Sequence, residues 1–166
     1  LRRRAGLLED LPAAEAEAAF DEVVLRPGAA DLLARLTDAG HHTAILTGGF
    51  ERGVERALDR EGVSVDTLIA NRLPVADGRL TGAVEGPLIE GTKDDALADL
   101  AEDLGAPLAE TVAVGDGAND LPMLEVAGLA VGFRPKDAVR PACDVVVATM
   151  PRLGRVFEER GLLDAA

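Results

Sequence analysis

A short buried strand that ends in a turn rich in glycine and aspartate constrains this chain most. Residues 112–114 form an apolar run typical of a parallel strand that is covered on both faces. The sequence GDGAND follows at 115–120, and its residue types tolerate the backbone angles of a tight turn. Open α/β sheets place ligands at the carboxyl ends of their strands. We therefore expect Asp116 and Asp120 to hold a hard divalent cation, or the groups around it.

Length and charge narrow the possible classes of protein. The chain has 166 residues, the size of one domain, and its 48% hydrophobic content supports a core. A net charge of −13 argues against nucleic acid or an anionic membrane as the main partner. A small phosphorylated substrate stays possible where a local cation or a metal offsets its charge.

Cysteine content and hydropathy bear on the compartment. The single cysteine, Cys143, excludes an internal disulfide, and we expect it to be an inert buried thiol. No apolar run approaches the length of a membrane span, and no signal peptide is visible, so a cytoplasmic location is predicted. The chain begins at Leu1 rather than Met, and its first residues have the pattern of a helix interior. We therefore expect a fragment of a longer protein.

Strand and helix signals alternate along most of the chain. This spacing predicts an α/β fold with a mainly parallel sheet and right-handed crossovers. Residues 71–86 differ, because apolar residues alternate about Asp77-Gly78, which predicts a β-hairpin that projects from the sheet. The other expected strands are 42–46, 65–70, 112–114, 127–133 and 143–147, and the expected helices lie within 1–24, 28–39, 50–60, 93–104 and from about 151 onward.

Two further segments carry candidate site residues. Thr47-Gly48-Gly49 follows a strand and is expected to open a helix, where a hydroxyl and free backbone N–H groups suit an anion. The alternative is an ordinary turn in which Thr47 caps the helix. Lys93 stands at another expected helix start. A cation there opposes the helix dipole, which is slightly unfavourable unless an anion lies in front of it. A solvated surface lysine is the alternative there, although only two of the 17 basic residues are lysines.

Together these motifs resemble those of the haloacid dehalogenase-like phosphatases. The stretches LRPGAADLLARLTDAGH, LTGGF, ANRL, DGRLTGAVEG, GTK and TVAVGDGANDLPML further resemble the phosphoserine phosphatase family of the SerB type. The resemblance covers nearly the whole chain. It implies a Rossmann-like parallel sheet with helices on both faces, with the end of a helical cap at 1–24 and the core at 25–166.

The resemblance also implies a role for each matching residue. Thr47 matches the hydroxyl that binds the phosphoryl group, Gly48 an adjacent backbone donor, and Lys93 the lysine that stabilises the phosphoryl group and the aspartyl-phosphate. Asp116 matches the carboxylate that binds Mg²⁺, and Asp120 the second acid, which supports the metal site. The substrate contacts would be completed by Asn119 on the phosphate side and by Arg4, which matches the cap arginine that pairs with the substrate carboxylate.

One motif of the family is missing. Its first strand carries Asp-x-Asp-x-Thr/Val, with the nucleophile and the general acid–base, and no such sequence follows an apolar strand here. In the family this strand lies between the strands that bear the second and fourth motifs. Without it, sheet edges would be exposed and backbone groups unpaired. We therefore expect the nucleophile to lie upstream of this chain.

Several functions remain open at this point. The resemblance implies Mg²⁺-dependent hydrolysis of O-phosphoserine to L-serine, with a homodimer as a possible assembly. A related small-molecule phosphatase, or a phosphotransferase with homoserine as acceptor, is the first alternative, since cap residues decide the substrate. The second is a catalytically inactive remnant that acts as a binding module, and we expect the 166 residues alone to be inactive.

Overall fold

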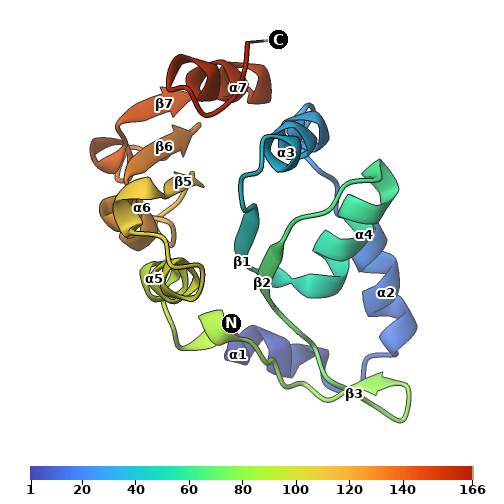
Figure 1. Ribbon diagram of the computed structural model, residues 1–166. Coiled ribbons are helices and arrows are strands. Elements are labelled where there is room, and N and C mark those ends of the chain that lie inside the picture. The colour runs from blue at the N-terminus through green and yellow to red at the C-terminus, as the bar shows by residue number, and fades with distance from the viewer. Residues whose placement is uncertain (166) are drawn as a thin grey trace. The chain divides into compact units, whose positions relative to one another are not determined.

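The computed structural model describes residues 1–165, which divide into two compact units. The first unit is Leu1–Glu90, and the second begins at Gly91. Helices alternate with parallel strands in both units, as the sequence predicts (Figure 1). No helix among residues 1–165 has both the length and the apolar content needed to cross a bilayer. The division into a cap remnant at 1–24 and a core at 25–166 stays a prediction.

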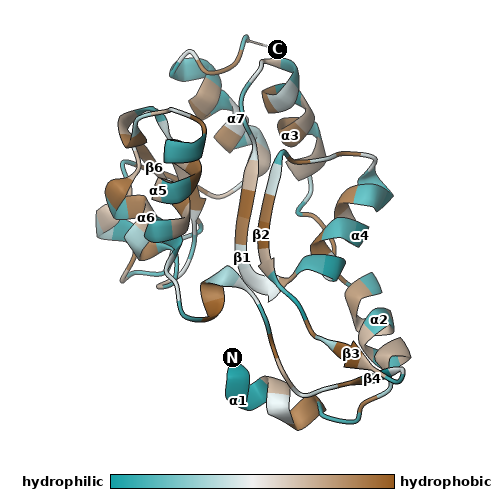
Figure 2. Cartoon of the chain, turned by 60° about the horizontal axis from the view of Figure 1, so that its bottom comes forward, coloured by the Kyte–Doolittle hydropathy of each residue, from teal (hydrophilic) through white to brown (hydrophobic). Residues whose placement is uncertain are grey.

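The first unit is built around a pair of parallel strands. Figure 2 shows hydrophobic residues along the middle of both strands. Helix α4 (Glu51–Glu61) is followed by Gly62, whose φ of 67° is the left-handed conformation that glycine adopts at helix ends. The elements of this unit are α1 (Arg2–Ala5), α2 (Ala13–Asp21), α3 (Ala29–Asp38), β1 (Ala44–Phe50), α4 (Glu51–Glu61), β2 (Thr67–Asn71), β3 (Val75–Ala76) and β4 (Arg79–Leu80).

The end of β1 differs from the sequence prediction. The strand continues to Phe50 and helix α4 begins at Glu51, so Thr47 neither opens nor caps a helix. The register explains the difference. Leu46 pairs with Ile69 and Phe50 with Asn71, so residues 47–49 lie opposite the single residue Ala70. The sequence Thr-Gly-Gly thus forms a bulge, a feature that redirects side chains and recurs beside active sites.

The predicted hairpin is confirmed. Strands β3 and β4 pair antiparallel, and the turn residues Asp77 and Gly78 have φ values of 50° and 75°. Positive φ at both positions defines the turn type that joins two-residue hairpins. Leu80 packs with Ala16 and Phe20 of α2 in a small hydrophobic cluster.

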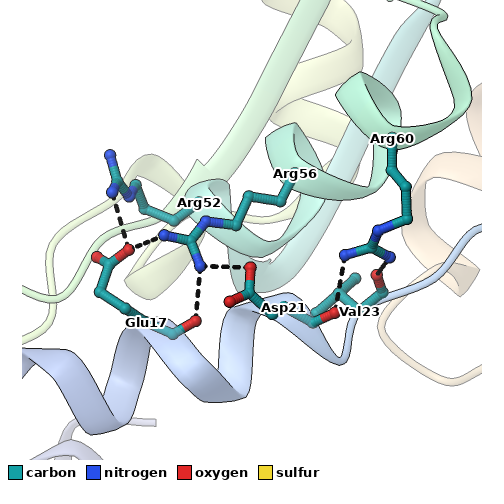
Figure 3. Close-up of polar contacts among 6 residues, drawn as sticks. All are labelled: Glu17, Asp21, Val23, Arg52, Arg56 and Arg60. Atoms are coloured by element: carbon teal, nitrogen blue, oxygen red, sulfur yellow. Dashed lines mark hydrogen bonds and ion pairs between the residues drawn. The ribbon is translucent and has the colours of Figure 1, made fainter.

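Within the first unit, arginines of α4 form hydrogen bonds and ion pairs with residues of the α2 segment (Figure 3). Arg56 contacts the side chain of Glu17 and donates to its backbone carbonyl at 2.7 Å, and it reaches Asp21 Oδ1 at 2.6 Å. Arg52 also pairs with Glu17, at 2.9 Å. Arg60 donates to the carbonyl oxygens of Asp21 and Val23, which lie at the carboxyl end of α2. Helices α2 and α4 therefore lie side by side (Figure 1).

The second unit contains a three-stranded parallel sheet in the order β5-β6-β7. The central strand, β6, is buried along its whole length. Leu104, the last residue of the helix expected at 93–104, lies just beyond α5 (Lys93–Asp103) as its C-cap and is 49% exposed. The elements are α5 (Lys93–Asp103), β5 (Val112–Gly115), α6 (Leu121–Val126), β6 (Leu129–Phe133), β7 (Val145–Val147) and α7 (Met150–Glu159).

Candidate active site

The loop that follows β5 is organised by the carboxylate of Asp120. Asp120 Oδ2 accepts hydrogen bonds from the backbone N–H groups of Asp116 at 2.8 Å and Gly117 at 3.1 Å. Although Asp120 immediately precedes α6, its side chain does not cap that helix. It folds back onto the end of the strand and closes the loop.

Gly115 makes this arrangement possible. A Cβ atom at this position would lie 2.4 Å from Asp120 Cβ and 2.7 Å from its carboxyl carbon. Both distances are far below contact, so the last residue of β5 must be glycine for the carboxylate to lie against the strand. The glycine of the sequence motif is thus explained by close approach.

Lys93 and Asp120 form a largely buried ion pair. The Lys93 Nζ atom donates to Asp120 Oδ1 at 2.5 Å, and the two side chains are only 14% and 10% exposed. Burial raises the pKa of Asp120, but the hydrogen bonds from Lys93, Asp116 and Gly117 outweigh it and hold that pKa below its ordinary value. Asp120 is therefore a carboxylate at neutral pH. The alternative of a solvated surface lysine at position 93 is excluded.

Asp116 and Asn119 differ from the buried Asp120 in being accessible to a ligand. Both residues are exposed, and Asp116 is held in place through its backbone, whose carbonyl accepts from Lys136 N–H at 2.9 Å. The Asp116 carboxylate has no hydrogen-bond or ion-pair partner within the described chain, so it is available to a cation.

A complete metal site is not formed by these residues. Residues 1–165 contain no group of three or more histidine, cysteine or acidic side chains placed to hold a metal ion. Asp120 is occupied by Lys93 and two N–H groups, which leaves Asp116 as the single free carboxylate of the motif. One carboxylate fits Mg²⁺ only if substrate oxygens and other groups complete the octahedron.

The first unit carries the candidate phosphoryl-binding hydroxyl. Thr47 is half-buried in the β1 bulge, and its Oγ1 accepts from the Gly49 N–H at 3.0 Å. Gly48 and Gly49 are exposed beside it. The structure thus keeps Thr47 and Gly48 together at the carboxyl end of a parallel strand, although in a bulge and not at a helix start.

Asn71 is a site residue that the sequence motifs do not indicate. This residue is fully buried at the end of β2, and its Nδ2 donates to the Gly48 carbonyl at 2.9 Å. An amide side chain at the last position of an otherwise apolar strand was the available signal, since such a residue needs a polar partner once it is buried.

The three arginines of α1 differ in their contacts. Arg2 pairs with Glu90, whereas Arg4 is exposed and has no ion-pair partner among the described residues. Arg3 is likewise exposed and without an ion-pair partner among these residues, so Arg3 and Arg4 are both available to a substrate carboxylate.

Cys143 is half-buried, where the sequence predicts an inert buried thiol. Its thiol packs on the core cluster of the second unit and approaches the Val139 carbonyl at 3.4 Å. Burial raises the pKa of this thiol, so it is protonated and unreactive at neutral pH.

The fold and the loop geometry define a class of enzyme. A parallel sheet that ends in an ordered aspartate loop, with a buried lysine beside it, suits the binding and stabilisation of a phosphoryl group. The family model for haloacid dehalogenase-like hydrolase matches residues 2–125. The chain belongs to this family, and its fold class, predicted from the sequence, is confirmed.

Several of the proteins similar to this chain are phosphoserine phosphatases. The chain is 54% identical over 162 residues to a phosphoserine phosphatase of Halobacterium salinarum, a match that covers 98% of this chain and 77% of that protein. It is 38% identical to a phosphoserine phosphatase of Methanocaldococcus jannaschii, with 89% and 69% covered. A substrate-bound phosphoserine phosphatase structure matches with a TM-score of 0.83 and 35% identity over 96% of this chain and 74% of that one.

Proposed function

We propose that this chain forms the greater part of a Mg²⁺-dependent phosphomonoester hydrolase that converts O-phosphoserine to L-serine and phosphate. The buried Lys93–Asp120 pair at the end of β5 carries the proposal, because it holds a cation where a phosphoryl group would bind. The phosphoserine phosphatases among the similar proteins support the choice of substrate.

Each residue has a distinct task in this proposal. Lys93 stabilises charge on the transferring phosphoryl group, and Asp120 fixes its position and shapes the loop. Thr47 donates its hydroxyl hydrogen to a phosphoryl oxygen, with Gly48 as an adjacent backbone donor. Asn119 contacts the phosphate side of the substrate, and Arg4 pairs with the amino-acid carboxylate.

Mg²⁺ would be held by Asp116 together with substrate oxygens and groups outside the described residues. When bound, the cation supplies further neutralisation of phosphoryl charge.

The reaction proceeds in two steps in this proposal. A carboxylate oxygen of the Asp-x-Asp-x-Thr/Val motif attacks phosphorus, the bond to the serine oxygen breaks, and the leaving oxygen takes up a proton from the general acid–base of the same motif, which later recovers a proton from the attacking water. Water then attacks the aspartyl-phosphate and releases phosphate, which regenerates the carboxylate. Lys93 and Thr47 act on the phosphoryl oxygens in both steps, because both steps pass through the same kind of charge distribution.

The attacking carboxylate belongs to a segment outside these 166 residues in our proposal. The expected Asp-x-Asp-x-Thr/Val motif is missing from the sequence. In the described chain, β1 pairs only with β2, and β5 pairs only with β6, so each sheet has a free edge beside a site strand. Both observations support a further strand that brings the nucleophile. The 166 residues alone are then inactive, and a homodimer and a cytoplasmic location stay predictions.

Phosphate release tests this proposal. The 166-residue chain and a longer product that includes the preceding gene segment are each assayed with O-phosphoserine, phosphohomoserine and a simple aryl phosphate, with and without Mg²⁺. We expect Mg²⁺-dependent release, with phosphoserine preferred, from the longer product alone. Equal activity of the 166-residue chain would refute the external nucleophile, and a preference for another ester would refute the substrate.

A further inference from the structure

Asn71 has an environment that packing alone does not explain. The residue is 0% exposed, and its Oδ1 has no hydrogen-bond partner in the part of the chain that the structure describes. A buried polar atom without a partner lowers stability. The side chain therefore serves the fold poorly, and its one hydrogen bond, from Nδ2 to the Gly48 carbonyl at 2.9 Å, needs another explanation.

A single peptide group connects Asn71 to Thr47. Its carbonyl belongs to Gly48 and accepts from Asn71, while its N–H belongs to Gly49 and donates to Thr47 Oγ1 at 3.0 Å. Because the peptide group is planar, holding the carbonyl also sets the direction of the N–H on the opposite side. Asn71 therefore sets the direction of the Gly49 N–H that donates to the Thr47 hydroxyl oxygen.

In this hydrogen bond the Thr47 hydroxyl oxygen is the acceptor. A threonine hydroxyl has one hydrogen to donate and two lone pairs. With one lone pair taken by the Gly49 N–H, the hydroxyl hydrogen stays free, since no acceptor for it is found among residues 1–165. A hydroxyl fixed in this way presents its hydrogen to a ligand, and the ligand that it suits is an oxyanion.

The local backbone needs such a restraint. Residues 47–49 are the bulged part of β1 and lack regular ladder pairing with β2, and two of them are glycines. The backbone at Gly86 lies against Asn71, and only glycine leaves room for the amide, because a Cβ there would lie 2.3 Å from Asn71 Oδ1 and 2.9 Å from the Ala70 carbonyl. The Asn71 amide is thus confined on one side and directed at the bulge on the other.

We propose that Asn71 is a positioning residue that, through the Gly48–Gly49 peptide group, orients the Thr47 hydroxyl to donate to a phosphoryl oxygen. The proposal rests on the function proposed above for Thr47. Asn71 itself touches neither the substrate nor the reacting atoms.

Hydrogen exchange of the Gly49 amide tests the connection without any need for activity. Asn71→Leu removes the donor at similar volume, and Asn71→Ala is a second variant in case the first does not fold. We expect Gly49 to exchange about tenfold faster in both variants, because its acceptor geometry is lost. Thr43→Val is the matched control. It removes a buried hydroxyl that contacts Asp66 at the opposite end of the same strand pair, so it tests for general loosening.

Affinity for inorganic phosphate tests whether the effect passes through Thr47. We expect Asn71→Leu to weaken phosphate binding about tenfold in the wild-type background and less than about twofold in the Thr47→Val background. Unchanged Gly49 exchange, or an equal loss of affinity in both backgrounds, would overturn the proposal. Failure of the proposed function is a separate result, namely no phosphoserine hydrolysis by the longer product although Gly49 exchange and phosphate affinity respond as expected.

Discussion

Lys93 donates a hydrogen bond to Asp120 at 2.5 Å, and this contact joins the first residue of α5 to the residue that precedes α6. The sequence predicts that both residues serve a phosphate and metal site. The structure adds a division of labour between the two aspartates of the motif. Asp120 is occupied by Lys93 and the loop N–H groups, whereas Asp116 is exposed and open to a cation.

Substitution of each aspartate by asparagine separates these roles. Asp120→Asn leaves the buried Lys93 without a counter-charge, and we expect the free energy of unfolding to fall by about 3 kcal/mol. Asp116→Asn alters an exposed side chain, so its effect on stability is within about 0.5 kcal/mol. Urea unfolding at pH 7 measures both changes. Equal losses in the two variants would contradict the division of labour.

The pH dependence of stability follows from the lowered pKa of Asp120. A carboxyl group with a lower pKa in the folded state contributes stability above its unfolded value, about 3.9, and this contribution is lost as pH falls through the folded value. The stability difference between the wild type and Asp120→Asn should therefore be full near pH 6 and shrink below about pH 4. Urea unfolding of both proteins from pH 6 to pH 3 measures it, and a constant difference would argue against the ion pair as its source.

Substitution of Gly115, the last residue of β5, should be far more damaging than substitution of Gly117 in the loop that follows. Gly115→Ala places a methyl group 2.4 Å from Asp120 Cβ, and we expect a loss of about 2–3 kcal/mol in stability because the loop must shift. Gly117→Ala is the control, because a Cβ at this position meets nothing within 4 Å. Thermal unfolding and phosphate release are measured for both variants in the longer product. Comparable damage from the two substitutions would contradict close approach as the reason for Gly115.

Much of the fold could be predicted because its signals are local. The apolar run at 112–114, the Asp77-Gly78 turn and the helix expected at 50–60 each depend on a few neighbouring residues, and all three are confirmed. The pairing of Lys93 with Asp120 is less local, but both residues stand at the boundary of a helix near the end of β5. The sequence motifs in which they lie were sufficient to predict both as site residues.

Other features depend on register and could not be predicted. Whether Thr-Gly-Gly forms a turn or a bulge is decided by how β1 pairs with β2, and one sequence does not show this pairing. The same register brings Asn71 beneath Gly48. The contacts of the α4 arginines could not be predicted either, since their partners in α2 and just beyond it lie more than 30 residues away in sequence.

The contacts of Arg56 with α2 predict a measurable effect on stability. Arg56 joins the Glu17 carbonyl and two carboxylates, so Arg56→Gln should lower the free energy of unfolding by about 1 kcal/mol. The effect should decrease at high salt, because screening weakens the charge interactions but not the contact with the carbonyl. Arg52→Gln, which loses one exposed ion pair, is the matched control, and a larger loss in that control would refute the prediction.

Removal of divalent cations should affect activity and leave the fold intact. Asp120, the buried acid of the loop, is neutralised by Lys93 and two N–H groups, so the loop needs no metal to remain folded. We expect chelation to abolish phosphate release by the longer product with little change in Tm, and Mg²⁺ to restore it. Asp116→Asn should raise the Mg²⁺ concentration needed for half-maximal activity about tenfold or more. A large drop in Tm on chelation would show a structural metal instead.

Two substitutions at Thr47 distinguish the contribution of its hydroxyl, which can accept and donate a hydrogen bond, from that of its methyl group. Thr47→Ser keeps the oxygen that accepts from Gly49 and the hydrogen that donates, so kcat/KM for phosphoserine should stay within about threefold of the wild type. Thr47→Val keeps the shape and removes both capabilities, and we expect kcat/KM to fall about 10²–10³-fold, as for loss of one donor to a transition-state oxyanion. The loss should lie mainly in kcat, because the phosphoryl oxygens gain the most from this donor as charge develops on them. Steady-state kinetics of the longer product measure this split. A Thr47→Val variant with wild-type kcat and a raised KM would show that the hydroxyl contributes only to ground-state binding.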